Sequence, residues 1–389
     1  MDSLKLKPGH DRRVKRGHPW VYSNEIDVAA TPLKGLTPGA TVRVVDSEGG
    51  LIGHGHASPA NLIAVRLLSR EEATGEAIDD ALLTRRLERA LRWREQLYPQ
   101  PYYRWVYGEG DELPGLVVDR YGDACVVQTS TWGMEAALDR IVSAIDALVS
   151  PETLVVKNTN SARVVEGLPA YVDVKRGNPQ ALVVESEATF EVNLAEGQKT
   201  GWFFDQADNR SRFPQLYRGA RVLDLYGYVG GWGVRAATRG ASRVVCVDSS
   251  ETAVAATRAN AHRNAVGETV TAVRADVADF LKDHAEKYDI VILDPPALVR
   301  RRKDLKSATA LYRHLNRAAI GCLAPGGLLI TCSCSSQLDA ETHLGIVRAG
   351  ARQARRDLFV VGRGSMPPDH PIHPLITESE YLKCVFLRG

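Results

Sequence analysis

Two cysteines stand two positions apart in the stretch ITCSCSS, residues 330–336, at the end of an apolar run. A cysteine pair can ligate a metal, form a redox couple, fill a core or supply a nucleophile. Zinc takes about four ligands, and no closely spaced cysteine and histidine set accompanies this pair, since His370 and His373 lie well beyond it. A redox pair usually has two intervening residues at a helix start, whereas this pair has one. The sequence therefore predicts no metal site and disfavours a redox pair, which leaves a buried thiol and a nucleophile as the open alternatives.

Acidic residues end several apolar runs in the second half of the chain. From about residue 219, β-branched runs alternate with helical segments, a rhythm typical of a doubly wound parallel sheet. We expect its strands at 221–227, 243–248, 270–276, 288–296 and 327–333. Ligands of such sheets bind outside the carboxyl ends of the strands. Four of the five runs end near Asp248, Asp276, Asp294 or Cys334, and Asp224 lies inside the first, so the sequence predicts a ligand site at this edge.

The first turn of this expected sheet reads DLYGYVGGWG, residues 224–233. Its glycines let the chain turn tightly and let a ligand approach the backbone. The dinucleotide pattern G-x-G-x-x-G does not fit, because Val229 stands where a second glycine would follow Gly227. Asp248, which closes the second strand, can accept hydrogen bonds from ribose hydroxyls. Together these features predict an adenosine-containing ligand and disfavour a nicotinamide cofactor.

Asp294 is followed by two prolines, which cannot continue a strand and hold the chain stiff beside the expected cleft. An ordinary turn is the alternative interpretation. The basic stretch RRRKDLK comes next and could contact phosphates or form a solvated charged loop, two roles that spacing alone leaves open. Its cations are Arg300, Arg301, Arg302, Lys303 and Lys306.

The first half of the chain has a different texture. Short alternating segments, with turn residues at 48–50, predict a small β-rich module over residues 1–75. An amphipathic helix is expected over 76–100, and a small central α+β domain over 76–187 accounts for the strands and helix that follow. The first module begins with a basic patch that suits phosphates and a stacking surface, although a solvated basic arm explains it equally well. The patch comprises Arg12, Arg13, Lys15, Arg16 and Trp20.

Length and composition are those of a multidomain globular protein. A chain of 389 residues, 44% hydrophobic and 25% charged, should split into two or three domains. No stretch approaches the ~18 apolar residues of a membrane span, and the N-terminus lacks a signal peptide's apolar region, so we expect a cytoplasmic protein without a membrane partner. Six sparse cysteines should be reduced thiols. The net charge of +2 gives no nucleic-acid signal by itself.

Over essentially its full length the chain resembles the RlmI-like family of S-adenosylmethionine-dependent large-subunit ribosomal RNA (cytosine-C5) methyltransferases. The matching stretches are RGHPWVYSNEI, GLVVDRYGD, GQKTGWFFDQADNR, VLDLYGYVGGWG, CVDSS, RADVADF, LDPPALV and TCSCSS. The resemblance implies an α/β fold with an N-terminal PUA-like RNA-binding β-barrel (1–75), a small central α+β domain (76–187) and a Rossmann-like class I methyltransferase domain (188–389). It also implies S-adenosyl-L-methionine as cofactor and large-subunit (23S) ribosomal RNA as partner, and it leaves open whether the protein is a homodimer.

The resemblance assigns cofactor-binding roles to positions of this sequence. They comprise the first turn (Asp224, Tyr226, Gly227, Tyr228 and Gly230), the ribose and adenine contacts (Asp248, Ser249, Asp276 and Val277), a lid (Lys199, Thr200, Gly201, Phe204 and Asp205), and Asp294. Tyr226 and Tyr228 stand where methyltransferase turns more usually have small residues. The family's Asp-Gln-Arg is Asp205-Gln206-Ala207 here, so the role of that arginine is lost or has moved to Arg210.

The implied reaction explains the need for a cysteine. Cytosine C5 is a weak nucleophile, and addition of a thiolate to C6 turns C5 into an enamine-like carbon that can attack the sulfonium methyl. An acid near N3 assists this addition, which is a role for Asp294. We favour Cys334 as the nucleophile because it lies nearer the carboxyl end of the strand, with Cys332 as the second choice. Both side chains are expected on one face of that strand.

The target base must leave its helix to reach such a pocket, so RNA-binding surface is required as well. We assign it to the basic patch of the first module and to Arg301 and Lys303. Two rival functions stay open: a methyltransferase acting on another base atom, such as guanine N7 or N2, and a non-catalytic RNA-binding assembly factor. For the segment DHPIHP (369–374), which resembles a family tail segment, we favour a structural loop role.

Overall fold

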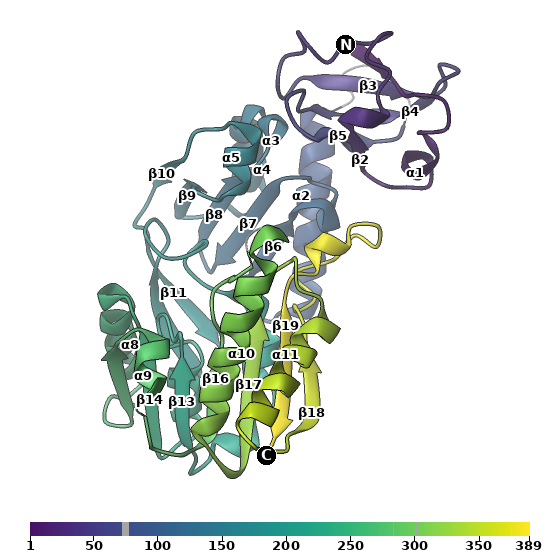
Figure 1. Cartoon of the computed structure of the whole chain (residues 1–389). Helices are drawn as coiled ribbons and strands as arrows, with labels where there is room; N and C mark the ends of the chain where they lie inside the picture. The colour runs from purple at the N-terminus through teal and green to yellow at the C-terminus, as the bar shows by residue number, and fades with distance from the viewer. Residues whose placement is uncertain (72–77, 283, 300–301) are drawn as a thin grey trace. The chain divides into compact units, whose positions relative to one another are not determined.

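The computed structural model describes residues 1–71, 78–282, 284–299 and 302–389 (Figure 1). Its internal contacts divide the chain into two compact units. The first unit comprises Met1–Ala181, Asn193–Trp202 and Pro368–Thr377, and the second comprises Leu182–Val192, Phe203–Pro367 and Glu378–Gly389. The chain therefore returns to the first unit twice after leaving it. The three-domain division expected from the sequence stays a prediction.

The N-terminal part of the first unit is a five-stranded sheet with the strand order β1-β3-β4-β5-β2. Val42 and Val44 alternate inward along one strand and join a cluster of buried apolar side chains. The Asp46 carboxylate accepts the amide N–H groups of Glu48 and Gly50 (2.9 and 2.8 Å), which closes the expected turn between two strands. The elements are β1 (Asp2–Lys5), α1 (Arg12–Lys15), β2 (Trp20–Tyr22), β3 (Thr41–Val45), β4 (Leu51–Ala57) and β5 (Ile63–Ser69).

The rest of the first unit has a core of its own. Helix α2 (Asp80–Leu97) packs against a second five-stranded sheet with the order β10-β9-β8-β7-β6. The Asp79 carboxylate caps its first turn by accepting the amide of Leu82 at 2.7 Å. The other elements are β6 (Tyr102–Tyr107), β7 (Leu116–Tyr121), β8 (Ala124–Thr129), α3 (Trp132–Ala136), α4 (Leu138–Val149), β9 (Thr153–Asn158), α5 (Ala162–Glu166) and β10 (Tyr171–Arg176).

The sequence did not predict β6 or β10. In β6 the apolar run is interrupted by Arg104, which can be buried because its charge is matched by Asp119 of β7 at 2.8 Å. In β10 the side chains are half-buried or exposed, so the alternation is weak. A two-stranded sheet of β11 (Gln180–Glu185) and β12 (Ala188–Asn193) follows.

The second unit is built on a seven-stranded sheet with the order β15-β14-β13-β16-β17-β19-β18. Its first five strands are parallel, and β19 is antiparallel to both β17 and β18. The chain passes from β13 outward to β14 and β15 and then returns to β16 on the other side of β13. Such a reversal opens a crevice at the carboxyl ends of the two central strands. The strands are β13 (Arg221–Leu225), β14 (Arg243–Asp248), β15 (Val270–Arg274), β16 (Tyr288–Leu293), β17 (Leu323–Ser333), β18 (Phe359–Gly364) and β19 (Lys383–Arg388).

Helices cover this sheet, and α10 and α11 lie side by side in front of β16 and β17 (Figure 1). The helices are α6 (Ala207–Ser211), α7 (Gly233–Thr238), α8 (Glu251–Arg263), α9 (Val277–Lys282), α10 (Leu305–Gly321) and α11 (Ala340–Gln353). Short 3-10 turns occur at 23–25, 108–111, 204–206, 214–217, 302–304 and 377–379. None of the helices that the structure describes is long and apolar enough to cross a membrane.

Four of the five expected strands of this sheet have other bounds in the structure, and one of them, β17, begins at Leu323 rather than at residue 327. The strands β13, β15 and β16 end two or three residues earlier than expected, because turn residues such as Gly227 and Pro295 follow them directly. Neither β18 nor β19 was expected. The apolar side chains of β18 are exposed or half-buried, and β19 begins at a buried lysine, Lys383, so neither strand shows the usual pattern.

Candidate active site

The loop between β13 and α7 contains residues in unfavourable backbone conformations, which hydrogen bonds from neighbouring elements stabilise. Tyr226 and Tyr228 have left-handed φ angles of +67° and +49°, which L-residues with large side chains rarely adopt. The amides of Tyr226 and Gly227 donate to the carbonyl of Val247 (2.9 and 3.1 Å), and the amide of Tyr228 donates to the Asp248 carboxylate at 3.0 Å. Such strained residues cluster at ligand sites.

Helix α8 fixes the carbonyl groups of the same loop. The hydroxyl of Thr257 donates to the carbonyl of Tyr228 at 2.8 Å, and the side-chain amide of Asn260 donates to the carbonyl of Val229 at 3.0 Å. At the start of α7, a Cβ on Gly233 would lie 2.2 Å from the sulfur of Cys246. Glycine is therefore required there, because it lets α7 begin directly against β14.

Asp224, inside β13, is fully buried and incompletely satisfied. Its Oδ2 accepts the amide of Gly233 at 2.9 Å, and the thiol of Cys246 lies 3.8 Å from the same atom. Its Oδ1 has no hydrogen-bond partner among the residues that the structure describes. Burial raises the pKa of Asp224 to about 7, and the negative charges of Asp294 and Asp248 contribute to that rise. A ligand that brings a donor or a positive charge would complete this group.

Asp248 and Asp276 hold the next two turns. The half-buried Asp248 accepts the amide of Ser250 at 2.9 Å in addition to that of Tyr228. Each carboxylate oxygen has two lone pairs, so Asp248 can accept further bonds. Asp276 is exposed and accepts the amides of Ala278 and Asp279 (2.8 and 3.2 Å), which starts α9. Of the two neighbouring predicted residues, Ser249 is exposed and Val277 is buried.

Asp294 follows β16 and receives two side-chain N–H groups. The amide of Gln206 lies 3.0 Å from both carboxylate oxygens, and the indole of Trp232 donates to Oδ2 at 3.1 Å. Asn209 orients Gln206 by donating to its carbonyl oxygen at 2.7 Å. The sequence reasoning missed Gln206, Trp232 and Asn209 as site residues, because their distances from Asp294 along the chain carry no local signal.

The structure separates the two cysteines of the opening motif. Cys332 lies inside β17, fully buried, and its sulfur is 3.2 Å from that of Cys384 on β19. Burial, and then the contact with Cys384, raises its pKa well above the ordinary value. Cys334 lies one residue beyond β17 and is half-buried, with its sulfur 3.9 Å from the carbonyl of Pro295. The expected shared strand face is therefore wrong, since the strand ends at Ser333.

A buried lysine lies beside the second cysteine. Lys383 stands opposite Ser333 in the pairing of β19 with β17, and its ammonium donates to the carbonyls of Ser335 and Tyr381, both at 2.6 Å. Burial lowers the pKa of Lys383, whereas the charge of Cys334 acts in the opposite direction. The ammonium and Cys334 are therefore electrostatically coupled. No sequence signal pointed to this residue, because the strand that carries it was not expected.

Hydroxyl groups hold the same turn from α10. The hydroxyl of Ser333 donates to that of Tyr312 at 3.0 Å, and Tyr312 and Ser335 are 3.1 Å apart. The amide of Val299 donates to Ser335 at 3.2 Å. Cys334 thus sits between two buried serines whose positions are fixed. Among the described residues, no group of three or more His, Cys, Asp or Glu side chains is arranged to hold a metal ion.

Two family models match this chain. A PUA-like domain matches residues 4–70, and an S-adenosylmethionine-dependent methyltransferase matches residues 174–388. A protein of Shewanella denitrificans named ribosomal RNA large subunit methyltransferase I is 34% identical over 99% of this chain and 98% of its own length. The protein of that name from Shigella boydii is 32% identical over 98% of this chain and 97% of its own. The chain belongs to this methyltransferase family.

Solved structures give the same fold. A protein described as a methyltransferase, solved with SAH, aligns over 100% of both chains with a TM-score of 0.84 and 22% identity. A chain from Streptococcus mutans described as an S-adenosylmethionine-dependent methyltransferase aligns equally fully, with a TM-score of 0.81 and 21% identity. These likenesses concern the fold alone. The expected α/β class, with a PUA-like and a Rossmann-like methyltransferase part, is confirmed.

The residues of this methyltransferase fit its cofactor. S-adenosylmethionine carries a sulfonium, an amino group and ribose hydroxyls, all of which suit carboxylate partners. Asp224 offers a buried acceptor that has no partner among the described residues, and Asp248 offers spare lone pairs at the end of the next strand. When bound, the cofactor supplies an electrophilic methyl group. The roles of individual residues stay predictions.

The predicted lid residues of the methyltransferase fall into different units. Lys199, Thr200 and Gly201 belong to the first unit, where the hydroxyl of Thr200 accepts that of Tyr121 at 3.0 Å and itself donates to Asp119. Phe204 and Asp205 belong to the second unit and are buried, and Asp205 accepts the hydroxyl of Tyr381 at 2.7 Å. Arg210 is also buried and pairs with Glu185 at 2.6 Å, so it supports the fold of the second unit.

The basic patch of the first module is partly neutralised. Arg13 pairs with Glu25 at 2.7 Å, and Lys15 pairs with Asp11 and Asp46 at 2.6 and 2.8 Å. The indole of Trp20 donates to Glu109 at 2.8 Å. Arg12, Arg16 and Lys303 are exposed, whereas Arg300 and Arg301 lie outside the described residues. The buried pair Asp369 and His370 of the DHPIHP segment belongs to the first unit, with 2.7 Å between them.

Proposed function

We propose that this methyltransferase forms 5-methylcytosine in large-subunit ribosomal RNA through a covalent bond between Cys334 and cytosine C6. Its full-length relatives are named for the methylation of large-subunit ribosomal RNA. The observation that carries the C5 chemistry is the placement of Cys334 beside the carbonyl of Pro295, directly after Asp294. Asp294 follows β16 and Cys334 follows β17. These neighbouring strands end at the same edge of the sheet, since Leu293 pairs with Thr331. A thiol and a carboxylate at the same edge match the needs of that reaction.

The covalent route balances in three steps. The Cys334 thiolate adds to C6, and the electron pair of the C5–C6 double bond makes C5 nucleophilic. C5 then forms a bond to the methyl group, whose bond to the sulfonium breaks. The C5 proton leaves to a base, the C6–sulfur bond breaks, and the thiolate is regenerated. The nearby ammonium of Lys383 stabilises the thiolate at the start and at the end of this sequence.

Asp294 is suited to hold the cytosine edge. Its carboxylate is fixed by the side-chain N–H groups of Gln206 and Trp232. A carboxylate so held accepts a hydrogen bond from the exocyclic amino group of cytosine. In its protonated form it donates a hydrogen bond to N3, whose basicity rises as the thiolate adds to C6. The contact therefore orients the base and assists the addition.

A trapping experiment tests the proposal. The full chain is incubated with S-adenosylmethionine and a large-subunit RNA transcript that contains 5-fluorocytosine, which cannot lose a proton from C5. We expect a covalent protein–RNA complex that survives denaturation, and its tryptic peptide should carry the adduct on Cys334. With the ordinary transcript, digestion should yield 5-methylcytidine. Methylation at guanine N7 or N2, or full activity of Cys334→Ser, would exclude the cysteine route.

A further inference from the structure

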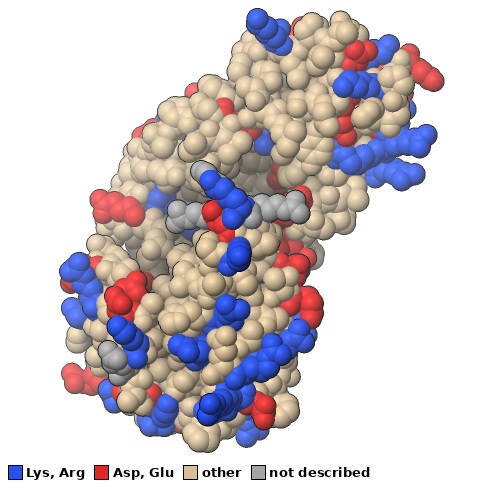
Figure 2. Space-filling model, in the orientation of Figure 1, with Lys and Arg blue, Asp and Glu red and all other residues tan. Residues whose placement is uncertain are grey.

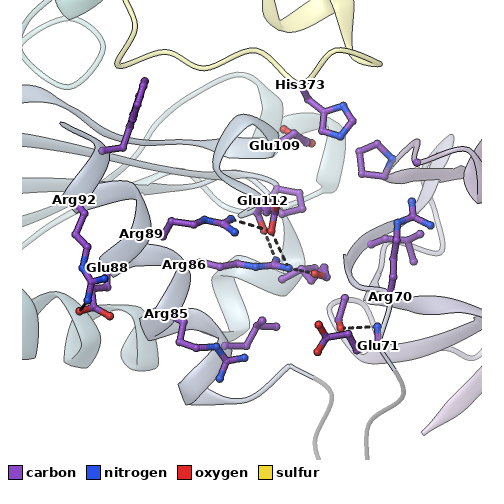
Figure 3. A pocket seen from close by; sticks show the side chains of 18 of the residues that line it. Arg70, Glu71, Arg85, Arg86, Glu88, Arg89, Arg92, Glu109, Glu112 and His373 are labelled. Atoms are coloured by element: carbon purple, nitrogen blue, oxygen red, sulfur yellow. Dashed lines mark hydrogen bonds and ion pairs between the residues drawn. The ribbon is translucent and has the colours of Figure 1, made fainter. Parts of the chain in front are cut away.

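The first unit contains a cavity of about 880 Å³ between the end of β5 and helix α2 (Figure 3). None of the predicted RNA-binding residues at 12–16 or Trp20 lines it, although Gly17 and Pro19 of the same segment do, and it has no part in the proposed chemistry. On one wall, α2 presents the arginines at 85, 86, 89 and 92, whose spacing places them along neighbouring turns. Arg70 faces them from the other wall. Five guanidinium groups therefore line one cavity.

Three of the four carboxylates that line the cavity are already engaged, and the fourth is that of Glu71. Glu112 is shared by Arg89 at 2.9 Å and Arg86 at 3.4 Å. Glu88 pairs with Arg92, and Glu109 accepts the indole of Trp20. The pair between Arg89 and Glu112 is more than half exposed on both sides, and exposed pairs contribute little, so a phosphate can compete for these guanidinium groups.

Two of the arginines lack a carboxylate partner in the described part of the chain. Arg70 donates to the carbonyl of His18 at 3.1 Å. Partial burial of its guanidinium lowers the pKa of Arg70, and no nearby carboxylate raises it again among the described residues. Arg85 has no hydrogen bond or ion pair among the described residues. Burial lowers the pKa of Arg86, and the positive charges of Arg89 and Arg85 add to that effect against Glu112 and Glu71. The arginines that line the cavity therefore repel one another, and a bound anion would relieve that repulsion.

An aromatic side chain stands at the same cavity. Trp93 is 45% exposed on α2, next to Arg92, and its indole donates to the carbonyl of Pro368 at 3.3 Å, which fixes the ring. Exposed tryptophans beside cations form stacking platforms for bases, whereas free phosphate or an acidic peptide would make no use of the ring. The combination favours single-stranded RNA over these anions.

We propose that this cavity binds a single-stranded segment of the RNA substrate, with phosphates on Arg70 and Arg85 and a base stacked on Trp93. The inference rests on the proposed function, because it concerns the RNA of the same reaction. It differs from the sequence-based assignment, which placed the RNA on the basic patch of residues 12–20 and on Arg301 and Lys303. It also predicts that the first unit binds RNA adjacent to the target base rather than the target base itself.

The test measures binding of a labelled single-stranded RNA of about 12 nucleotides to the full chain by fluorescence anisotropy at several salt concentrations. We expect the double variant Arg70→Gln/Arg85→Gln to raise the Kd roughly tenfold at low salt and to reduce the slope of log Kd against log salt by about 1.4, or about 0.7 for each phosphate contact. Trp93→Ala should raise the Kd roughly tenfold and leave the slope unchanged.

A matched control removes two arginines elsewhere. Lys and Arg side chains also gather over α10 and α11 of the second unit (Figure 2), where Arg348 and Arg352 are exposed. Arg348→Gln/Arg352→Gln removes the same charge, and we expect it to change the Kd less than threefold. Equal losses in both double variants would assign the effect to overall charge and overturn the inference, as would unchanged binding by the cavity variants or displacement of the RNA by an equimolar acidic peptide.

Methyl transfer separates this inference from the proposed function. All three variants should bind S-adenosylmethionine as the parent does, which shows that they are folded. If the parent chain forms the Cys334 adduct and 5-methylcytidine while the cavity variants bind RNA normally, the cavity inference fails alone. If the parent binds RNA through the cavity but yields neither adduct nor 5-methylcytidine, the proposed reaction fails and the cavity stands.

Discussion

The carboxyl edge of the seven-stranded sheet and the arginine-lined cavity are two regions with incompletely matched charge of opposite sign. At the edge, the buried Asp224 has an acceptor oxygen without a partner in the part of the chain that the structure describes, and it lies near the charges of Asp248 and Asp294. In the cavity, Arg70 and Arg85 have no carboxylate partner among the described residues. The first region suits a cationic cofactor and the second suits an anionic chain. Each region therefore holds charge that neighbouring side chains do not fully balance. The sign of that charge indicates whether the ligand is cationic or anionic.

The largest expected effect is a loss of methyl transfer at the sheet edge while RNA binding stays unchanged. Cys334→Ser should reduce methyl transfer on the order of 10³-fold or more, because a hydroxyl cannot replace the attacking thiolate. Cys332→Ser should retain activity within about threefold, since the Cys332 thiol is buried against Cys384. Initial rates with radioactive methyl donor measure both, and both variants should bind RNA normally. Equal losses in the two variants would contradict the assignment of the nucleophile.

The second prediction concerns the unmatched carboxylate. The pKa of Asp224 is raised to about 7, so its contribution to stability is fully present below its ordinary value near 3.8 and is lost as the pH rises through about 7. Asp224→Asn keeps an acceptor for Gly233 and has no charge to bury. In urea unfolding without cofactor, the variant should match the parent near pH 4 and exceed it by roughly 4 kcal/mol near pH 8, about 1.4 kcal/mol for each pKa unit. A difference that does not change with pH would refute this account.

The third prediction tests whether the edge and the cavity act separately. Asp248→Asn removes the charge at the end of β14, and we expect the Kd for S-adenosylmethionine to rise about tenfold to a hundredfold, because hydrogen bonds to charged groups contribute about 1.5–3 kcal/mol. Asp289, at the opposite end of the same sheet, pairs with Arg221, and Asp289→Asn serves as the control with unchanged affinity. Isothermal titration calorimetry measures both. A parallel loss of RNA affinity in Asp248→Asn would show that the two regions are coupled.

The same comparison explains what the sequence could predict. Asp224, Asp248, Asp294 and Cys334 could be assigned to one edge of the sheet from the sequence because consecutive parallel strands bring their carboxyl ends together, so local patterns suffice for that placement. Lys383 was missed, because its antiparallel strand has no usual pattern.

The cavity was missed for another reason. Arg70 and Arg85 come from separate elements, and their missing partners are visible only in three dimensions. Conversely, Arg13 and Lys15 formed a basic patch in the sequence, but Glu25 and Asp46 neutralise them in the fold. A run of like charges in sequence is therefore a weak guide until the acids that approach it are known.

The smallest expected effect concerns Lys383, a positioning residue that acts through Cys334. Its ammonium is held by the carbonyls of Ser335 and Tyr381 and is electrostatically coupled to the cysteine. Lys383→Met should slow alkylation of Cys334 by iodoacetamide about tenfold at neutral pH and move the pH profile of that reaction upward, because a nearby cation favours the thiolate. Lys383→Arg keeps the charge and should restore most of the rate. Alkylation is followed by mass spectrometry of the Cys334 peptide, so the readout needs neither RNA nor cofactor. If Met and Arg variants react equally slowly, Lys383 only supports the turn, and the thiolate must be stabilised by another group.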